Sequence, residues 1–369
     1  MPLDGEMPPR HELGAGLAFD RAISPALLAA LMPGGPLRGL VSRRQAAPWL
    51  LDLQLRRGAW GKRCWVSLYC GLTTVLDVEE SDGRYRLRAH PAHRAAGGFE
   101  PAWLVRQPLT ALAAAWPQVD GYLDRVIPRV PERHTAREGA VHACMCASAA
   151  PTYRIVNREA AVAFSTTTVK AQVTVPLQEG IAAALATPLS TSPWWAAAVA
   201  ARRPLGTGAD LLAVDTAGRL LVIEAKPADS PSGISWGPAQ VGFYARLFSR
   251  WVDHDEQAAV AVIGRMLRQR VQLGLTGPGL RGLRAPVQVV PVLAIGAGRY
   301  RTSAMARLWS LAARCAAGCR RIRGSIHLRC GCWTLPARPR SYTSGDVMLA
   351  GEGLIAAGTV SRVQRRTSA

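Results

Sequence analysis

A short hairpin with charged residues at the ends of apolar strands is the feature that most constrains this chain. Residues 208–226 read GADLLAVDTAGRLLVIEAK, so that Asp210 opens the first apolar run and Glu224-Ala225-Lys226 closes the second. Buried charges are costly unless they are paired or bind a metal ion. Lys226 is also one of only three lysines in a chain that otherwise uses arginine. Because an amine can share its proton where a guanidinium cannot, the hairpin predicts a chemical site.

The register of this hairpin follows from its turn. Residues 215–219 read DTAGR, and Gly218 can take the positive φ that such a turn demands. Counting back from the turn places Asp210 opposite Glu224 across the ladder. Lys226, two residues beyond Glu224, points to the same side. The remaining positions are apolar on both faces, which is typical of central strands covered by helices.

The two carboxylates at the end of this hairpin repel each other, and one lysine offsets the repulsion only in part. A hard divalent cation resolves it, because Mg²⁺ and Mn²⁺ prefer carboxylate and carbonyl oxygens. A metal held there can acidify a water and neutralise charge on a phosphodiester. Lys226 can then orient or deprotonate the attacking water, or stabilise the developing negative charge. The residues therefore predict hydrolysis with Mg²⁺ or Mn²⁺ as the cofactor.

The stretch of residues 175–295 resembles the PD-(D/E)XK nuclease superfamily. In that superfamily an Asp begins one strand and Glu-x-Lys ends the next, as Asp210 and the EAK of residues 224–226 do here. The branch of RecB-like nuclease domains adds Gln-x-x-x-Tyr on the following helix. Gln240 and Tyr244 match that motif and lie one helical turn apart.

The resemblance implies a role for each matched residue. Asp210 and Glu224 are expected to be metal ligands, with the carbonyl of Ala225 as a third. Lys226 is expected to be the catalytic amine. Many members carry a further Glu on a preceding helix, and Glu179 is the candidate here. The family's Asp often follows a Pro, whereas Ala209 precedes Asp210 in this chain.

The resemblance also implies roles for the residues of the motif helix and a fold for the whole core. Gln240 and Tyr244 are expected to brace the site or to contact the nucleic-acid backbone. The fold is expected to be α/β, with a restriction-endonuclease-like core in which helices flank a central mixed sheet. A β-rich apolar run at residues 287–295 is expected to be the last core strand.

Three regions are expected along the chain. Residues 1–150 form an N-terminal region of unknown role with an antiparallel β meander, and residues 151–300 form the nuclease-like core. Residues 301–369 form a basic helical tail that is rich in Cys and Arg. The meander is expected from three β-rich runs separated by turns, at residues 65–69, 73–78 and 84–88. In the core, helices are expected at residues 177–185, 238–252 and 256–272.

The net charge of the chain points to a polyanionic partner. The formal charge is +20, and nucleic acid is the usual partner of so basic a protein. DNA is the expected substrate of the metal-dependent nuclease. A non-catalytic nucleic-acid-binding protein on the same fold is the alternative function.

The compartment is expected to be the cytoplasm. No signal peptide is visible, and no stretch reaches the roughly 18 apolar residues that a membrane helix needs. The eight cysteines are therefore expected to be free thiols. No membrane partner is expected.

Three weaker signals leave alternatives open. Trp236, just before the motif residues, can stack on a base or pack as a lid on the core. Asp215 is expected to be a turn residue rather than a ligand. A zinc site in the tail is the alternative to free thiols, but its spacing is irregular; its residues are Cys315, Cys319, His327, Cys330 and Cys332.

Overall fold

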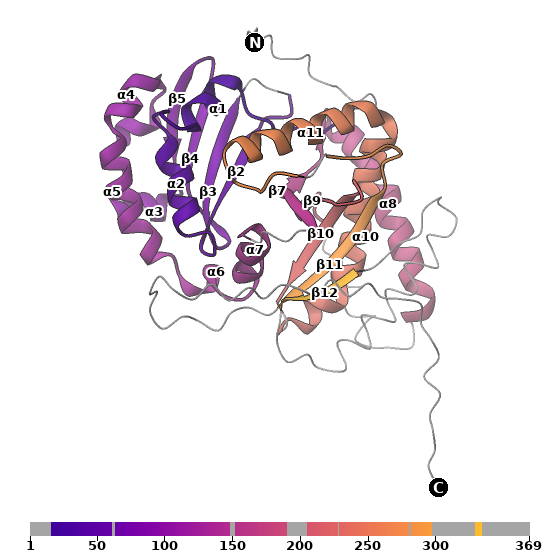
Figure 1. Cartoon of the computed structure of the whole chain (residues 1–369). Coiled ribbons are helices and arrows are strands. Elements are labelled where there is room, and N and C mark those ends of the chain that lie inside the picture. The colour runs from indigo at the N-terminus through magenta and orange to yellow at the C-terminus, as the bar shows by residue number, and fades with distance from the viewer. Residues whose placement is uncertain are drawn as a thin grey trace.

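The computed structural model describes residues 16–60, 63–147, 152–189, 205–227, 229–279, 282–296 and 329–333. Within these residues the chain forms two large sheets, each packed against helices (Figure 1). The fold is mixed α/β, as the sequence predicts. No helix in this part of the chain is long and apolar enough to cross a bilayer.

The central sheet is mixed and has the strand order β12-β11-β10-β9-β7. β7 pairs antiparallel with β9, and β9 pairs antiparallel with β10. β11 runs parallel to β10, and β12 runs parallel to β11. The bounds are Tyr153–Ala161 for β7, Gly208–Asp215 for β9, Leu220–Lys226 for β10, Val289–Gly296 for β11 and Arg329–Trp333 for β12.

Helices cover both faces of the central sheet, which explains why its strands are apolar on both sides. On one face, Leu212 and Val222 belong to a core built with α8, α10 and α11. On the other face, Leu211 and Ile223 pack in a second core with α7. The helices are α7 (Glu138–Ala147), α8 (Thr167–Leu189), α10 (Pro231–His254) and α11 (Glu256–Gln272).

The second large sheet is an antiparallel meander in the N-terminal region, in the order β2-β3-β4-β5-β6. One face of it is apolar and packs on the N-terminal helices. The strands are β2 (Leu51–Arg57), β3 (Cys64–Cys70), β4 (Thr73–Ser81), β5 (Arg84–Arg88) and β6 (Gln107–Pro108). The helices are α1 (Pro25–Leu31), α2 (Arg38–Ala46), α3 (Pro91–Gly97), α4 (Leu109–Ala114), α5 (Trp116–Val126) and α6 (Glu132–Thr135), with 3₁₀ turns at Pro101–Leu104 and Ile127–Arg129.

The two sheets are tied together by strands and by buried polar contacts. β1 (Leu17–Ala18) pairs with β8 (Ala163–Phe164), which follows the central strand β7. From α11, Gln269 bonds both the N–H and the carbonyl of Ile23. From β7, the side-chain guanidinium of Arg158 donates to the carbonyl of Gly71 at 2.7 Å. The meander therefore shares a buried interface with the central sheet.

Several elements differ from the sequence expectations. β11 is not the last strand of the central sheet, because β12 follows it in the chain and pairs with it. β2 and β7 were not predicted, because polar residues interrupt their apolar pattern. The helix expected to begin at Pro238 begins at Pro231 instead, and Pro238 lies inside α10. Proline has no N–H, so it costs one helical hydrogen bond there rather than setting the start of the helix. The helix expected at residues 177–185 is the longer α8.

Candidate functional site

The β9–β10 hairpin has the predicted register. Its ladder pairs Leu211 with Ile223, which places Asp210 and Glu224 opposite each other one step further on. The N–H of Ala225 donates to Oδ2 of Asp210 at 2.8 Å. The first carboxylate is thereby fixed against the backbone of the second strand, at the edge where both strands meet α7.

The turn of the hairpin explains why this register forms. Gly218 has a φ of 78°, a conformation that glycine adopts without a steric penalty. The Asp215 carboxylate accepts hydrogen bonds from the N–H groups of Ala217 and Arg219, at 3.0 and 2.9 Å. Asp215 is therefore a turn residue, as predicted, and its carboxylate lies at the opposite end of β9 from Asp210.

Lys226 pairs directly with Glu224. Its Nζ lies 2.6 Å from Oε1 of Glu224 and 4.0 Å from Oε1 of Glu138. The side chain of Glu224 is only 3% exposed and that of Lys226 is 12% exposed. Solvent thus has little access to the pair, and its charges are screened little.

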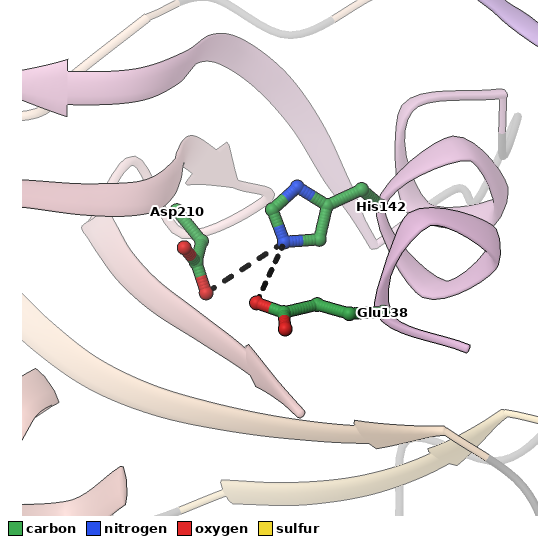
Figure 2. A group of neighbouring side chains, drawn as sticks. All are labelled: Glu138, His142 and Asp210. Carbon is green, nitrogen blue, oxygen red and sulfur yellow. Dashed lines mark ion pairs between the residues drawn. The ribbon is translucent and has the colours of Figure 1, made fainter. Parts of the chain in front are cut away.

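Helix α7 brings two further side chains to the hairpin, Glu138 and His142. Nε2 of His142 lies 3.7 Å from Oδ2 of Asp210 and 4.0 Å from Oε1 of Glu138. Figure 2 shows one nitrogen of the imidazole turned toward both carboxylates. One donor atom from each of the three residues lies within 4.8 Å of the others, so these residues could hold a metal ion together.

His142 is buried without a hydrogen-bond partner. Its side chain is 3% exposed, and neither ring nitrogen makes a hydrogen bond to any residue that the structure describes. Buried polar groups are nearly always satisfied, so an unsatisfied one calls for an explanation such as an ion or a water. The nitrogen that faces the two carboxylates, Nε2, is therefore placed to share a ligand with them.

The pKa values of the Glu224 and Asp210 carboxyl groups are shifted in opposite directions. Burial and the nearby Asp210 carboxylate raise the pKa of Glu224 to about 8. Burial also opposes ionisation of Asp210, but His142, Lys226 and the Ala225 N–H together lower its pKa. Burial lowers the pKa of Lys226, yet the charges of Glu224 and Asp210 outweigh that effect and raise it. The amine therefore stays protonated in this arrangement, which favours charge stabilisation over proton abstraction.

The motif helix brings Tyr244 close enough to Glu224 and Asp210 for their charges to act on it, with Gln240 beside Tyr244. Tyr244 is buried, and its pKa is raised by burial and then by the charges of Glu224 and Asp210. A hydrogen bond with Gln240 opposes that rise. Both residues therefore stand where a bracing role is possible, while contact with nucleic acid stays a prediction.

Glu138, which the sequence analysis did not name, lies beside the hairpin, whereas the predicted Glu179 does not. Glu179 lies exposed on α8, and among the described residues it makes no hydrogen bond or ion pair with the hairpin. Glu138 lies on the helix that reaches Lys226. A signal in the sequence that could have found Glu138 and His142 is the Glu-x-x-x-His spacing, which puts the two residues on one face of a helix. That helix lies before residue 151, so the site draws on residues from the expected N-terminal region.

The remaining expectations have separate outcomes. Trp236 packs partly buried against the core that contains α10, as expected of a lid. Ala225 lies in the parallel ladder opposite Ala294, and metal binding by its carbonyl stays a prediction. Of the proposed zinc cluster, Cys330 and Cys332 lie on β12, and the other three residues lie outside the described part of the chain. Four other cysteines, Cys64, Cys70, Cys144 and Cys146, are free thiols.

Comparison of the chain with family models, with curated proteins and with solved structures gives no match. The site is therefore described from its geometry alone.

Proposed function

We propose that this protein is a metal-dependent nuclease that hydrolyses phosphodiester bonds, with DNA as its substrate. The observation that carries the proposal is the meeting of Asp210, Glu224 and Lys226 at adjoining strand ends, beside Glu138 and His142. Three carboxylates share this place with one ammonium and one imidazole. A divalent cation offsets the excess of negative charge, and the donor atoms are of the kinds that bind one.

The metal ligands in this proposal are Asp210, Glu138 and His142, with Glu224 completing the set. Carboxylate oxygens suit Mg²⁺ and Mn²⁺, whereas an imidazole favours a transition metal. Mn²⁺ is therefore the ion to test first. When bound, such a cation acidifies a water and neutralises charge on a phosphodiester.

The chain's other residues supply charge and orientation. The Lys226 ammonium, held by Glu224, stabilises negative charge that develops on the phosphodiester oxygens. Gln240 and Tyr244 brace the carboxylates from α10. The free thiols among the described residues agree with a reducing compartment, and we place the reaction in the cytoplasm.

A cleavage assay tests the proposal. Wild-type protein and Lys226→Ala are incubated with plasmid, single-stranded and branched DNA in Mg²⁺, in Mn²⁺ and in chelator. We expect cleavage by the wild type only with a divalent ion. The variant should lose at least about 100-fold in rate, the usual cost of removing one group that stabilises developing charge, and should still bind DNA.

The control is Lys170→Ala, which removes an exposed lysine on α8 and should cleave at the wild-type rate. Equal cleavage by Lys226→Ala and Lys170→Ala contradicts the assigned role of Lys226. If the wild type cleaves none of the substrates with either metal, the non-catalytic nucleic-acid-binding alternative is favoured.

A further inference from the structure

The N-terminal sheet has one face that its hydrophobic core does not use. Along β3, Cys64, Val66 and Leu68 point into that core. Because side chains alternate along a strand, Trp65 and Ser67 point the other way. The polar face, as we call it, continues over three strands; it consists of Trp65, Ser67 and Tyr69 of β3, Asp77 and Glu79 of β4, and Arg86 and Arg88 of β5.

The polar face is ordered in rows across the sheet. Trp65 pairs with Glu79, and Glu79 pairs with Arg86 on the next strand. In the neighbouring row, Asp77 pairs with Arg88. Each row therefore ends in an arginine on β5, which is next to the short edge strand β6.

Glu79 holds four arginines in place on this face. Its carboxylate is 3% exposed and lies 2.8 Å from both Arg86 and Arg106. Arg88 and Arg63 lie further away, at 3.4 and 3.8 Å, and their side chains are 52% and 44% exposed. One carboxylate cannot neutralise four guanidinium groups, so the cluster keeps a positive charge. Such planar forks are suited to phosphate oxygens.

A polar hollow continues from this cluster. Its volume is about 260 Å³, and its lining includes Arg21, Arg56, Trp65, Tyr69, Asp77 and Glu159. The guanidinium of Arg63 stacks over the Trp65 ring, 4.8 Å from its centroid. The Tyr69 hydroxyl donates to Oε2 of Glu159 at 2.7 Å. The hollow thus combines cations, hydrogen-bonding groups and an aromatic ring, which are the groups that hold a nucleotide.

The hollow adjoins the candidate site through β7. The β7–β9 ladder pairs Arg158 with Leu211 and Ala160 with Ala209. Glu159 of the hollow lies between these pairs on β7, and Asp210 of the site lies between them on β9. Glu159 has a φ of 51°, an unusual backbone for a non-glycine residue at this position. A ligand in the hollow is therefore one strand away from the site's first carboxylate.

We propose that the polar face and the hollow bind a single-stranded segment of nucleic acid, which they lead to the candidate site; this deepens the proposed nuclease function and rests on it. Phosphates contact the exposed Arg63 and Arg88, and an unstacked base packs on Trp65. Charge favours this occupant, because six arginines meet three carboxylates among the residues named for the face, its arginine cluster and the hollow. The overall charge of +20 agrees with it.

Binding without cleavage tests this inference. Fluorescence anisotropy is measured in chelator, with a labelled single-stranded DNA of about 16 nucleotides, the upper end of common site sizes. Trp65→Ala should weaken binding about fivefold or more, and Trp65→Phe should restore most of it. Arg63→Ala/Arg88→Ala should reduce the slope of log affinity against log salt by roughly 1.4, at about 0.7 per lost phosphate contact. That double variant leaves Arg86 and Arg106 on Glu79, which protects the fold.

The matched control is Arg250→Ala/Arg268→Ala, which removes the same charge from exposed positions on α10 and α11. An equal loss of affinity in this control contradicts the inference, as does wild-type binding by the Trp65→Ala variant. Competition by polyglutamate as effective as by unlabelled DNA assigns the face to acidic peptides instead. Equal sensitivity to Trp65→Ala with duplex DNA contradicts the single-strand assignment. Lys226→Ala should bind normally, so a failure of catalysis is distinguishable from a failure of this surface.

Discussion

At the scale of the residue, the polar side chains of the site differ in whether they make a hydrogen bond or an ion pair. Glu224 has the Lys226 ammonium at 2.6 Å, and Asp210 has the Ala225 N–H. His142 has no hydrogen-bond partner among the described residues, although its side chain is buried. We therefore propose the buried imidazole, which faces two carboxylates, as the place where an added ligand would satisfy an unpaired polar group.

Sequence reasoning reached the hairpin residues but not those of α7. Asp210, Glu224 and Lys226 could be placed together because the turn at Gly218 fixes the register between neighbouring strands. Glu138 lies far from them in the chain, and no local rule connects a helix to a strand across that separation. Glu179 was proposed as a ligand because its helix precedes the hairpin in the chain. Order along the chain does not determine which face of the sheet a helix packs on.

Glu138 and Glu179 give a pair of predictions, because only Glu138 lies beside the hairpin. Glu138→Gln should lower the rate of Mn²⁺-dependent cleavage by about tenfold to a hundredfold at subsaturating metal, the usual cost of disturbing a metal site. Glu179→Gln should leave the rate unchanged, because Glu179 is exposed on α8. Initial rates measured across a range of Mn²⁺ concentrations check both. A larger loss with Glu179→Gln than with Glu138→Gln would restore the sequence assignment.

At the scale of the element, the apolar pattern predicted strands only where it was unbroken. β10 and β11 are nearly continuous aliphatic runs and were found from the sequence. β2 and β7 carry buried polar residues, among them Arg56, Asn157 and Arg158, which pair with one another across the interface between the sheets. Such pairing satisfies the polar groups but leaves no periodic signal in the sequence. The length of α10 was missed because Pro238 resembles a helix start.

The turn between β9 and β10 gives a stability prediction at this scale. Gly218→Ala adds a Cβ that would lie 2.6 Å from the Arg284 Cβ and 2.9 Å from its backbone N, at a φ of 78°. The left-handed backbone costs about 1–2 kcal/mol in a non-glycine residue, and the overlap adds roughly 1–3 kcal/mol.

Gly83→Ala is the matched control, because Gly83 has a φ of 73° and open space around it. It should lose only the backbone term. Urea unfolding of both variants compares their free energies of unfolding. Equal losses of unfolding free energy in the two variants would show that Arg284 moves aside at little cost and that its contact does not fix the turn.

At the scale of the whole molecule, the two sheets are joined by buried charge as well as by apolar packing. Asp52 of β2 is 2% exposed, and its Oδ2 accepts a hydrogen bond from Gln54 at 2.7 Å. Burial alone would raise the pKa of Asp52, but Arg270 and Arg158 lower it. The polar face and the hollow exist because the central sheet covers only part of the meander. This arrangement of two sheets could not be predicted from the sequence, since local patterns do not specify contacts between distant elements.

A calorimetric titration of Mn²⁺ into the folded protein and into Asp210→Asn tests directly whether these strand ends hold a metal ion. We expect saturable Mn²⁺ binding to the wild type and its loss in Asp210→Asn. The control Asp253→Asn, which changes an exposed carboxylate on α10, should bind as the wild type does. Thermal unfolding confirms that each variant is folded. Equal Mn²⁺ binding by Asp210→Asn and the wild type, or no binding to either, would contradict the claim that these strand ends form a metal site.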